Sequence, residues 1–187
     1  GAIVKRNDLD SFLKVLTHNI TSYLSISKAD IIQIIELRWI LERAALQRLI
    51  SAPEQTQVQR LAEMVEAQEQ ARLAADAEAY QEAHFRFHHA IIDALQNPVI
   101  SMIYRQALAL MRGPMGYAGR DPEIMRQAIE DHRKIVAALT TRSVKDMEAV
   151  LERHLADAID HHSASRTETE ATAQMSAALA EREALKT

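Results

Sequence analysis

The chain has 187 residues, of which 48% are hydrophobic, and this size and composition suit one domain with a substantial core. Its formal net charge of -4 at pH 7 gives no broad basic surface for nucleic acid. Because the chain lacks cysteine, it can form neither disulfides nor thiolate metal sites, so any metal must be held by His, Asp or Glu. No apolar run approaches the roughly 18 to 20 residues of a membrane span, and the N-terminus has no signal-peptide pattern, so we expect a cytoplasmic protein with no membrane association.

The composition predicts an all-α fold. Only four Gly and four Pro interrupt the sequence, whereas Ala, Leu, Glu, Gln and Arg are abundant. This balance favours helices over strands and hairpins. Residues 1–6 are a short β-prone fragment with no partner strand, and the apolar spacing that follows Asn7 predicts a first amphipathic helix.

Residues 31–50 predict a helix that is apolar around most of its circumference, which places it centrally in a bundle or against a partner subunit. Arg38 falls in line with its apolar residues, and Glu42 follows one turn later. Two interpretations of Arg38 stay open. It forms an internal pair with Glu42, or it presents its planar charged group to an anionic ligand in the bundle interior.

The remaining apolar spacings predict five further helices, over residues 54–75, around His84 and His88 as far as Asn97, over 99–112, over 122–139 and over 144–162. We expect the first of these to be mostly a solvated outer layer, and Asn97-Pro98 to end the second. Ser143 with Asp146 is predicted to cap the last helix. The tail over residues 163–187 is rich in Ala and Glu and helix-prone.

Four histidines fall on the core-facing stripes of three of these helices. His84 and His88 stand four residues apart and so share one helical face. Projection at about 100° per residue places His132 and His154 within the apolar stripes of two later helices. A buried imidazole needs a partner, which is either a core carbonyl or carboxylate, or a metal. Four converging imidazoles suit Zn²⁺ first, and also Ni²⁺, Fe²⁺ or Cu²⁺.

The same histidines give little support to an enzyme. No Glu lies between His84 and His88, so the HExxH motif of metalloproteases and its general base are absent. We also find no Asp or Glu spaced with the inward histidines to activate a water. We therefore expect no catalysis. A metal-dependent hydrolase and a structural helical dimerisation module with satisfied core histidines are the alternatives.

Four separated blocks carry a family resemblance, namely ELRWILERAA (36–45), FHHAIIDALQNP (87–98), DHRKIVAAL (131–139) and MEAVLERHL (147–155). In order and spacing they resemble the FCD ligand-sensing domain of GntR-type transcriptional regulators of the FadR subfamily. The resemblance implies an antiparallel bundle of six or seven helices, usually dimeric, C-terminal to a winged helix-turn-helix domain that binds operator DNA. It implies three segments: a wing-strand remnant and linker helix (1–27), an effector-binding and dimerisation domain (28–162) and the tail (163–187).

The resemblance also implies metal ligands. Three histidines of the family's site correspond to His88, His132 and His154, while the fourth position, an Asp in many members, is His84 here. This departure removes one negative charge from the site and shifts its preference toward ions that favour nitrogen ligands.

The implied ligand is a small carboxylate metabolite that completes the metal coordination and is clamped by arginine. Arg38 stands in the family's ELR block, and Arg105 and Arg112 are further candidates. The implied assembly is a homodimer, and operator DNA would be bound only through the N-terminal domain that these 187 residues lack.

Overall fold

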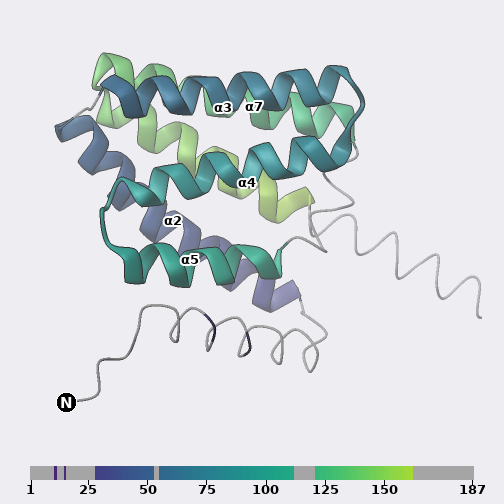
Figure 1. Cartoon of the computed structure of the whole chain (residues 1–187), viewed down its shortest axis with the longest axis horizontal. Helices are drawn as coiled ribbons and strands as arrows, with labels where there is room; N and C mark the ends of the chain where they lie inside the picture. The colour runs from purple at the N-terminus through teal and green to yellow at the C-terminus, as the bar shows by residue number, and fades with distance from the viewer. Residues whose placement is uncertain (1–10, 12–14, 16–27, 53–54, 112–120, 162–187) are drawn as a thin grey trace, which may run out of the picture.

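Six helices and no strand make up residues 28–52, 55–111 and 121–161, which the computed structural model describes together with Ser11 and Val15 (Figure 1). The all-α prediction is therefore confirmed. The helices are α2 (Lys28–Ser51), α3 (Gln55–Leu73), α4 (Ala77–Asp93), α5 (Pro98–Leu110), α7 (Pro122–Thr141) and a last helix over residues 144–161.

Short polar side chains begin four of these helices. Asp76 accepts from the Ala79 backbone N–H at 2.9 Å and so caps α4. Asn97 and Asp121 cap α5 and α7 in the same way, and each is followed by a proline in the first turn. The Ser143 hydroxyl accepts from the backbone N–H of Asp146 at 3.3 Å, as predicted. Each cap pairs backbone donors that a helix start leaves unsatisfied.

The end of α4 differs from the prediction. The helix stops at Asp93, and Gln96 takes a left-handed backbone conformation with φ of 53°. Asn97 and Pro98 then begin α5. The sequence predicts a helix stop at this pair, but the same two residues are also a favourable N-cap and first-turn proline.

The packing of the helices places one face of α4 inside the bundle. Helix α3 packs on α4 and α7, and α2 packs on α4, α5 and α7. The last helix joins the bundle through ion pairs from Glu148 to Arg43 of α2 and from Arg153 to Asp131 of α7. Although most of α3 is solvated, as expected, it buries Gln68 on its inner side.

No helix within residues 28–161, as far as the structure describes them, is both long and apolar enough to cross a membrane. The predicted wing remnant and linker helix (1–27) lie outside the described residues, apart from Ser11 and Val15, which are helical. The tail (163–187) and Arg112 lie wholly outside them.

Candidate metal centre

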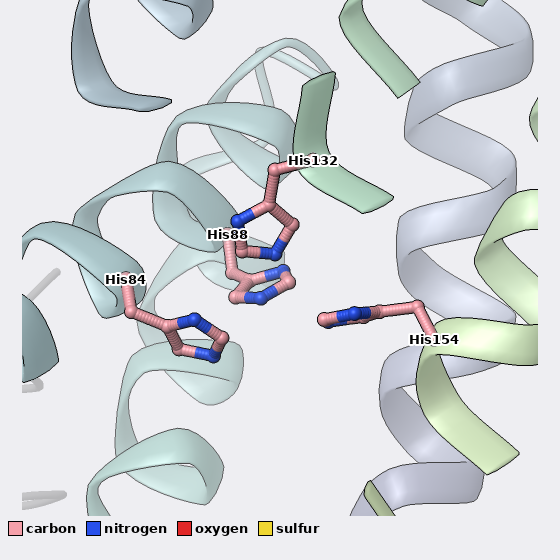
Figure 2. Close-up of side chains that lie close together, drawn as sticks. All are labelled: His84, His88, His132 and His154. Carbon is pink, nitrogen blue, oxygen red and sulfur yellow. The ribbon is translucent and has the colours of Figure 1, made fainter. Parts of the chain in front are cut away.

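The four histidines selected from the sequence lie together in the bundle. His84 and His88 come from adjacent turns of α4, His132 from α7 and His154 from the last helix. Figure 2 shows their rings directed toward a common centre. One ligand nitrogen from each residue lies within 4.8 Å of the others. Three helices thus bring four nitrogen donors to one point.

The cluster is closed to solvent. His88 and His132 are fully buried, and His84 and His154 are only 4% and 6% exposed. The ring centroids of His132 and His154 are 4.7 Å apart, and the Phe87 ring stacks on His132 at 4.2 Å. Because water has little access, a ring nitrogen that finds no partner in the protein stays unsatisfied.

Burial keeps three of these imidazoles neutral. Desolvation lowers the pKa of His84, His88 and His132 well below the ordinary value of 6.5. Neighbouring charges add to the effect, chiefly His154 for His84 and His132, and Arg38 for His88. A neutral imidazole carries one nitrogen with a free lone pair, which is the form that binds a metal.

In two of the rings, a hydrogen-bond partner outside the cluster determines which nitrogen carries the free lone pair. His88 Nδ1 lies 2.9 Å from Glu42 Oε2, and His132 Nδ1 lies 2.8 Å from Gln68 Oε1. An oxygen acceptor holds the proton on Nδ1, so Nε2 keeps its lone pair. His132 Nε2 is buried and has no hydrogen-bond partner among the described residues. Metal-bound histidines in proteins have outer partners of this kind.

His154 is oriented by a carboxylate. Its Nδ1 lies 3.7 Å from Asp131 Oδ2, and Asp131 also pairs with Arg153. Burial opposes ionisation of Asp131, but its neighbours His154 and Arg153 lower its pKa below the ordinary value. The Asp131 carboxylate is therefore negative at neutral pH and attracts the Nδ1 side of the ring.

His84 is the exception in the cluster. Its Nδ1 is buried without a hydrogen-bond partner among the described residues, and it occupies the position where the resemblance implies Asp. Two buried imidazole nitrogens, His84 Nδ1 and His132 Nε2, thus lack a partner beside the common centre. An all-nitrogen set of this kind fits Zn²⁺, Ni²⁺, Cu²⁺ or Fe²⁺. Nitrogens around one tetrahedral ion at about 2.1 Å lie about 3.4 Å apart, so binding an ion would draw the four rings closer together.

Arg38 lies against the cluster and is 1% exposed. Its Nε donates to Glu42 Oε1 at 2.9 Å, its Nη2 donates to His88 Nε2 at 2.9 Å, and its Nη1 is buried without a partner among the described residues. Burial alone would lower the pKa of Arg38, but the Glu42 charge and the nearby Tyr104 raise it above the ordinary value. Arg38 therefore pairs with Glu42 and also directs a permanent positive charge at the histidines.

The other two candidate arginines are not in this group. Arg105 is half exposed, pairs with Asp93 at 2.8 Å and lines a separate cavity that contains none of the four histidines. Arg112 lies outside the described residues.

Three polar residues of the site were missed in the sequence: Glu42 as a partner of a histidine, Gln68 and Asp131. Gln68 carried a usable signal, because it continues the buried stripe of Leu61 and Val65 on α3. A polar side chain on an apolar stripe needs a partner in the core. The sequence predicts Glu42 only as a partner of Arg38, and it gives Asp131 no separate role.

Comparison with known proteins fits this architecture. The model of the FCD domain matches residues 33–157. The structure of McbR/YncC from E. coli is similar, with a TM-score of 0.67 and 20% identity over 75% of this chain and 71% of that one. So is a structure of Lar, which controls expression of the agr system of Listeria monocytogenes, with a TM-score of 0.68 and 18% identity over 85% of this chain and 80% of that one.

No curated protein matches the chain. The FCD domain is a domain of transcription regulators, which are not enzymes, so the hydrolase alternative is set aside. The matched segment covers most of the described helices, including those that carry all four histidines. The chain therefore belongs to the FCD family, the effector domain of GntR-family transcription regulators such as McbR and Lar.

Proposed function

We propose that the chain senses a small carboxylate metabolite at a divalent metal held by His84, His88, His132 and His154, with Zn²⁺ the first candidate and Ni²⁺, Fe²⁺ or Cu²⁺ the others. The domain acts as a homodimer in the cytoplasm and touches operator DNA only through an N-terminal winged helix-turn-helix domain. Metabolite binding changes the relative placement of the two DNA-binding domains, provided that the ligand favours one arrangement over the other.

The unpaired nitrogens in the buried cluster carry this proposal. A structural dimerisation module with satisfied core histidines would pair each ring with a carbonyl or carboxylate. Here His84 Nδ1 and His132 Nε2 are buried without such partners in the described chain. Leaving a buried polar group unpaired costs about 1 to 3 kcal/mol, so a cation between the rings is the better explanation for the arrangement.

The charge balance supports an anionic effector. Imidazole ligands bring no negative charge, so four of them leave the charge of a bound cation uncompensated, and Arg38 adds a positive charge beside it. When bound, the metal would supply a Lewis-acidic centre, and a carboxylate would add to it as a fifth ligand beside the four imidazoles. A carboxylate is the ligand that meets both the cation and a guanidinium.

Arg38 links the metal to the effector. Its Nη2 donates to His88 Nε2, the same atom that would face a metal. If Nε2 is engaged by an ion, it no longer accepts from Arg38. Because Nη1 already lacks a partner, both terminal nitrogens of Arg38 then need an acceptor, and a carboxylate oxygen pair provides it.

The surface of α2 supports the dimer. Trp39 is 38% exposed and Ile40 is 58% exposed in the single chain. Large apolar side chains that neighbour each other on a surface are typical of association sites. The exposed residues favour the second of the two placements predicted for this helix, in which α2 lies between the bundle and a partner subunit.

A thermal-shift screen tests the sensor function. Protein stripped with EDTA and protein reloaded with Zn²⁺ are each mixed with mono-, di- and tricarboxylates and with the corresponding neutral amides. We expect at least one carboxylate, and not its amide, to raise the melting temperature of the reloaded protein only. At about 100 times Kd the gain in stability is about 2.7 kcal/mol. Carboxylates that stabilise both forms equally would contradict a metal-dependent site.

A further inference from the structure

A cavity lies on the side of α4 that faces away from the histidine cluster. Its volume is about 210 Å³, and α3, α4 and α5 all contribute to its walls. Arg86 lines it and lies two residues from both His84 and His88, which is roughly half a turn on a helix. The cavity and the histidine cluster therefore occupy opposite faces of α4.

The cavity is positively charged in a chain whose net charge is negative. Arg60 of α3, Arg86 of α4 and Arg105 of α5 line it, and Asp93 is the one carboxylate in its described lining. The three arginines exceed the one carboxylate by two positive charges, whereas the chain has a net charge of -4. A concave site with one sign of charge concentrates ions of the opposite sign.

Part of the lining is apolar. Leu61 is 1% exposed and lies in the wall beside Met64. The volume is below the roughly 300 to 1,000 Å³ of sites for drug-sized ligands, so the cavity suits a smaller molecule. Asp93 holds Arg105 at 2.8 Å through a half-exposed ion pair, which keeps that guanidinium at the rim.

We propose that this cavity binds a small organic oxyanion, a phosphate monoester or a carboxylate with a short apolar group. The oxyanion lies among the guanidinium groups of Arg60, Arg86 and Arg105, and the apolar group lies against Leu61 and Met64. Guanidinium groups bind phosphate and carboxylate through paired N–H donors. The site is separate from the metal centre and does not depend on the function proposed for it. It also gives Arg105 a place in anion binding other than the one expected from the sequence.

An NMR titration of the whole chain tests this site. Phenyl phosphate, benzoate and inorganic phosphate are titrated into ¹⁵N-labelled protein treated with EDTA. The variant Arg60→Gln/Arg86→Gln removes two rim charges. Its matched control, Arg48→Gln/Arg133→Gln, removes two exposed arginines elsewhere on α2 and α7.

We expect phenyl phosphate or benzoate to shift the amides around Arg60 and Arg86, with affinity reduced at least tenfold in the rim variant and unchanged in the control. Tighter binding of phenyl phosphate than of benzoate identifies the phosphate class, and the reverse order identifies the carboxylate class. Inorganic phosphate should bind more weakly than phenyl phosphate because it lacks the apolar group.

Three results would overturn the proposal. They are the absence of shifts at the cavity for both organic anions, equal weakening by the two double variants, and binding that is lost in EDTA and restored by Zn²⁺. The last result would assign the anion to the metal centre instead. Since the NMR shifts report position, failure at the cavity is distinguishable from failure of the metal site.

Discussion

Glu42 Oε2 lies 2.9 Å from His88 Nδ1, and both side chains are fully buried. The contact joins α2 to α4 across 46 residues of sequence. Glu42 also accepts from Arg38 Nε at 2.9 Å and from the Tyr104 hydroxyl at 2.5 Å. One carboxylate therefore fixes the tautomer of a proposed metal ligand and offsets the charge of the arginine beside it.

We predict that Glu42→Gln weakens Zn²⁺ binding by about 10- to 100-fold, as loss of an outer partner of a ligand does. It should also lower the free energy of unfolding of the metal-free protein by about 3 to 5 kcal/mol, since the buried Arg38 loses its counter-charge. Competition with a chromophoric chelator measures the first effect, and urea unfolding in EDTA measures the second.

Glu148→Gln is the matched control for Glu42. Glu148 pairs with Arg43 at 2.7 Å, but both side chains are at least one-third exposed. Surface pairs contribute about 0 to 1 kcal/mol, so this variant should leave Zn²⁺ affinity unchanged and stability nearly so. Equal effects of the two substitutions would contradict the role assigned to Glu42.

His84 is expected to set which metal is preferred. We predict that His84→Asp keeps a metal bound but raises the affinity for Mn²⁺ relative to Ni²⁺, because carboxylate oxygen suits Mn²⁺ and imidazole suits Ni²⁺. Calorimetric titration of both ions into each protein gives the ratio. His161→Asp makes the same substitution outside the cluster and should leave the ratio unchanged. A ratio that does not move with His84→Asp would exclude His84 as a ligand.

Arg38→Lys separates metal binding from effector binding. Lysine keeps the positive charge but loses the paired donors of guanidinium. We predict that the variant retains its metal, whereas the affinity for the carboxylate found in the screen falls at least tenfold, a loss of about 1.4 kcal/mol. Isothermal titration with Zn²⁺-loaded protein measures the affinity. Undiminished carboxylate binding would leave Arg38 with a structural role alone.

The buried histidines predict how stability depends on pH. Their folded-state pKa values lie well below 6.5 because of burial, so below pH 6.5 the unfolded chain takes up protons that the folded chain does not. Stability is therefore complete above about pH 6.5 and falls on acidification, by up to about 1.4 kcal/mol per pH unit for each histidine. Urea unfolding in EDTA between pH 7.5 and pH 5 tests this. His84→Leu should reduce the slope and His161→Gln should not, whereas a flat profile for the wild type would contradict the burial of these rings.

The fold and the four histidines were predictable because both follow from helical periodicity. His132 lies on the same stripe of α7 as Met125, Ile129 and Ile135, all of which are buried. A residue centred on such a stripe must face the core. The FCD resemblance then added the expectation that stripes from different helices meet.

The partners of the histidines could not be predicted in the same way. Gln68 lies 64 residues from His132 in the sequence, and Glu42 lies 46 residues from His88. Periodicity predicts which face of each helix is turned inward. It does not predict how far a helix is shifted along its axis, or rotated, relative to a neighbouring helix. Arg105 was a further candidate from the family resemblance, and in the structure it lines a cavity that contains none of the four histidines. Helix boundaries at Asn97 were ambiguous because one residue pair serves both as a stop and as a start.

The most direct test of the proposed metal site is the metal content of untagged protein purified without a nickel column, measured by inductively coupled plasma mass spectrometry. We predict about one divalent transition-metal ion per folded chain, because a site of this kind binds its ion as part of folding. His88→Ala and His132→Ala should each abolish it, and His161→Ala should not. Protein that holds no ion even after loading with Zn²⁺ and removal of the excess, or whose ion persists in both cluster variants, would contradict the metal site.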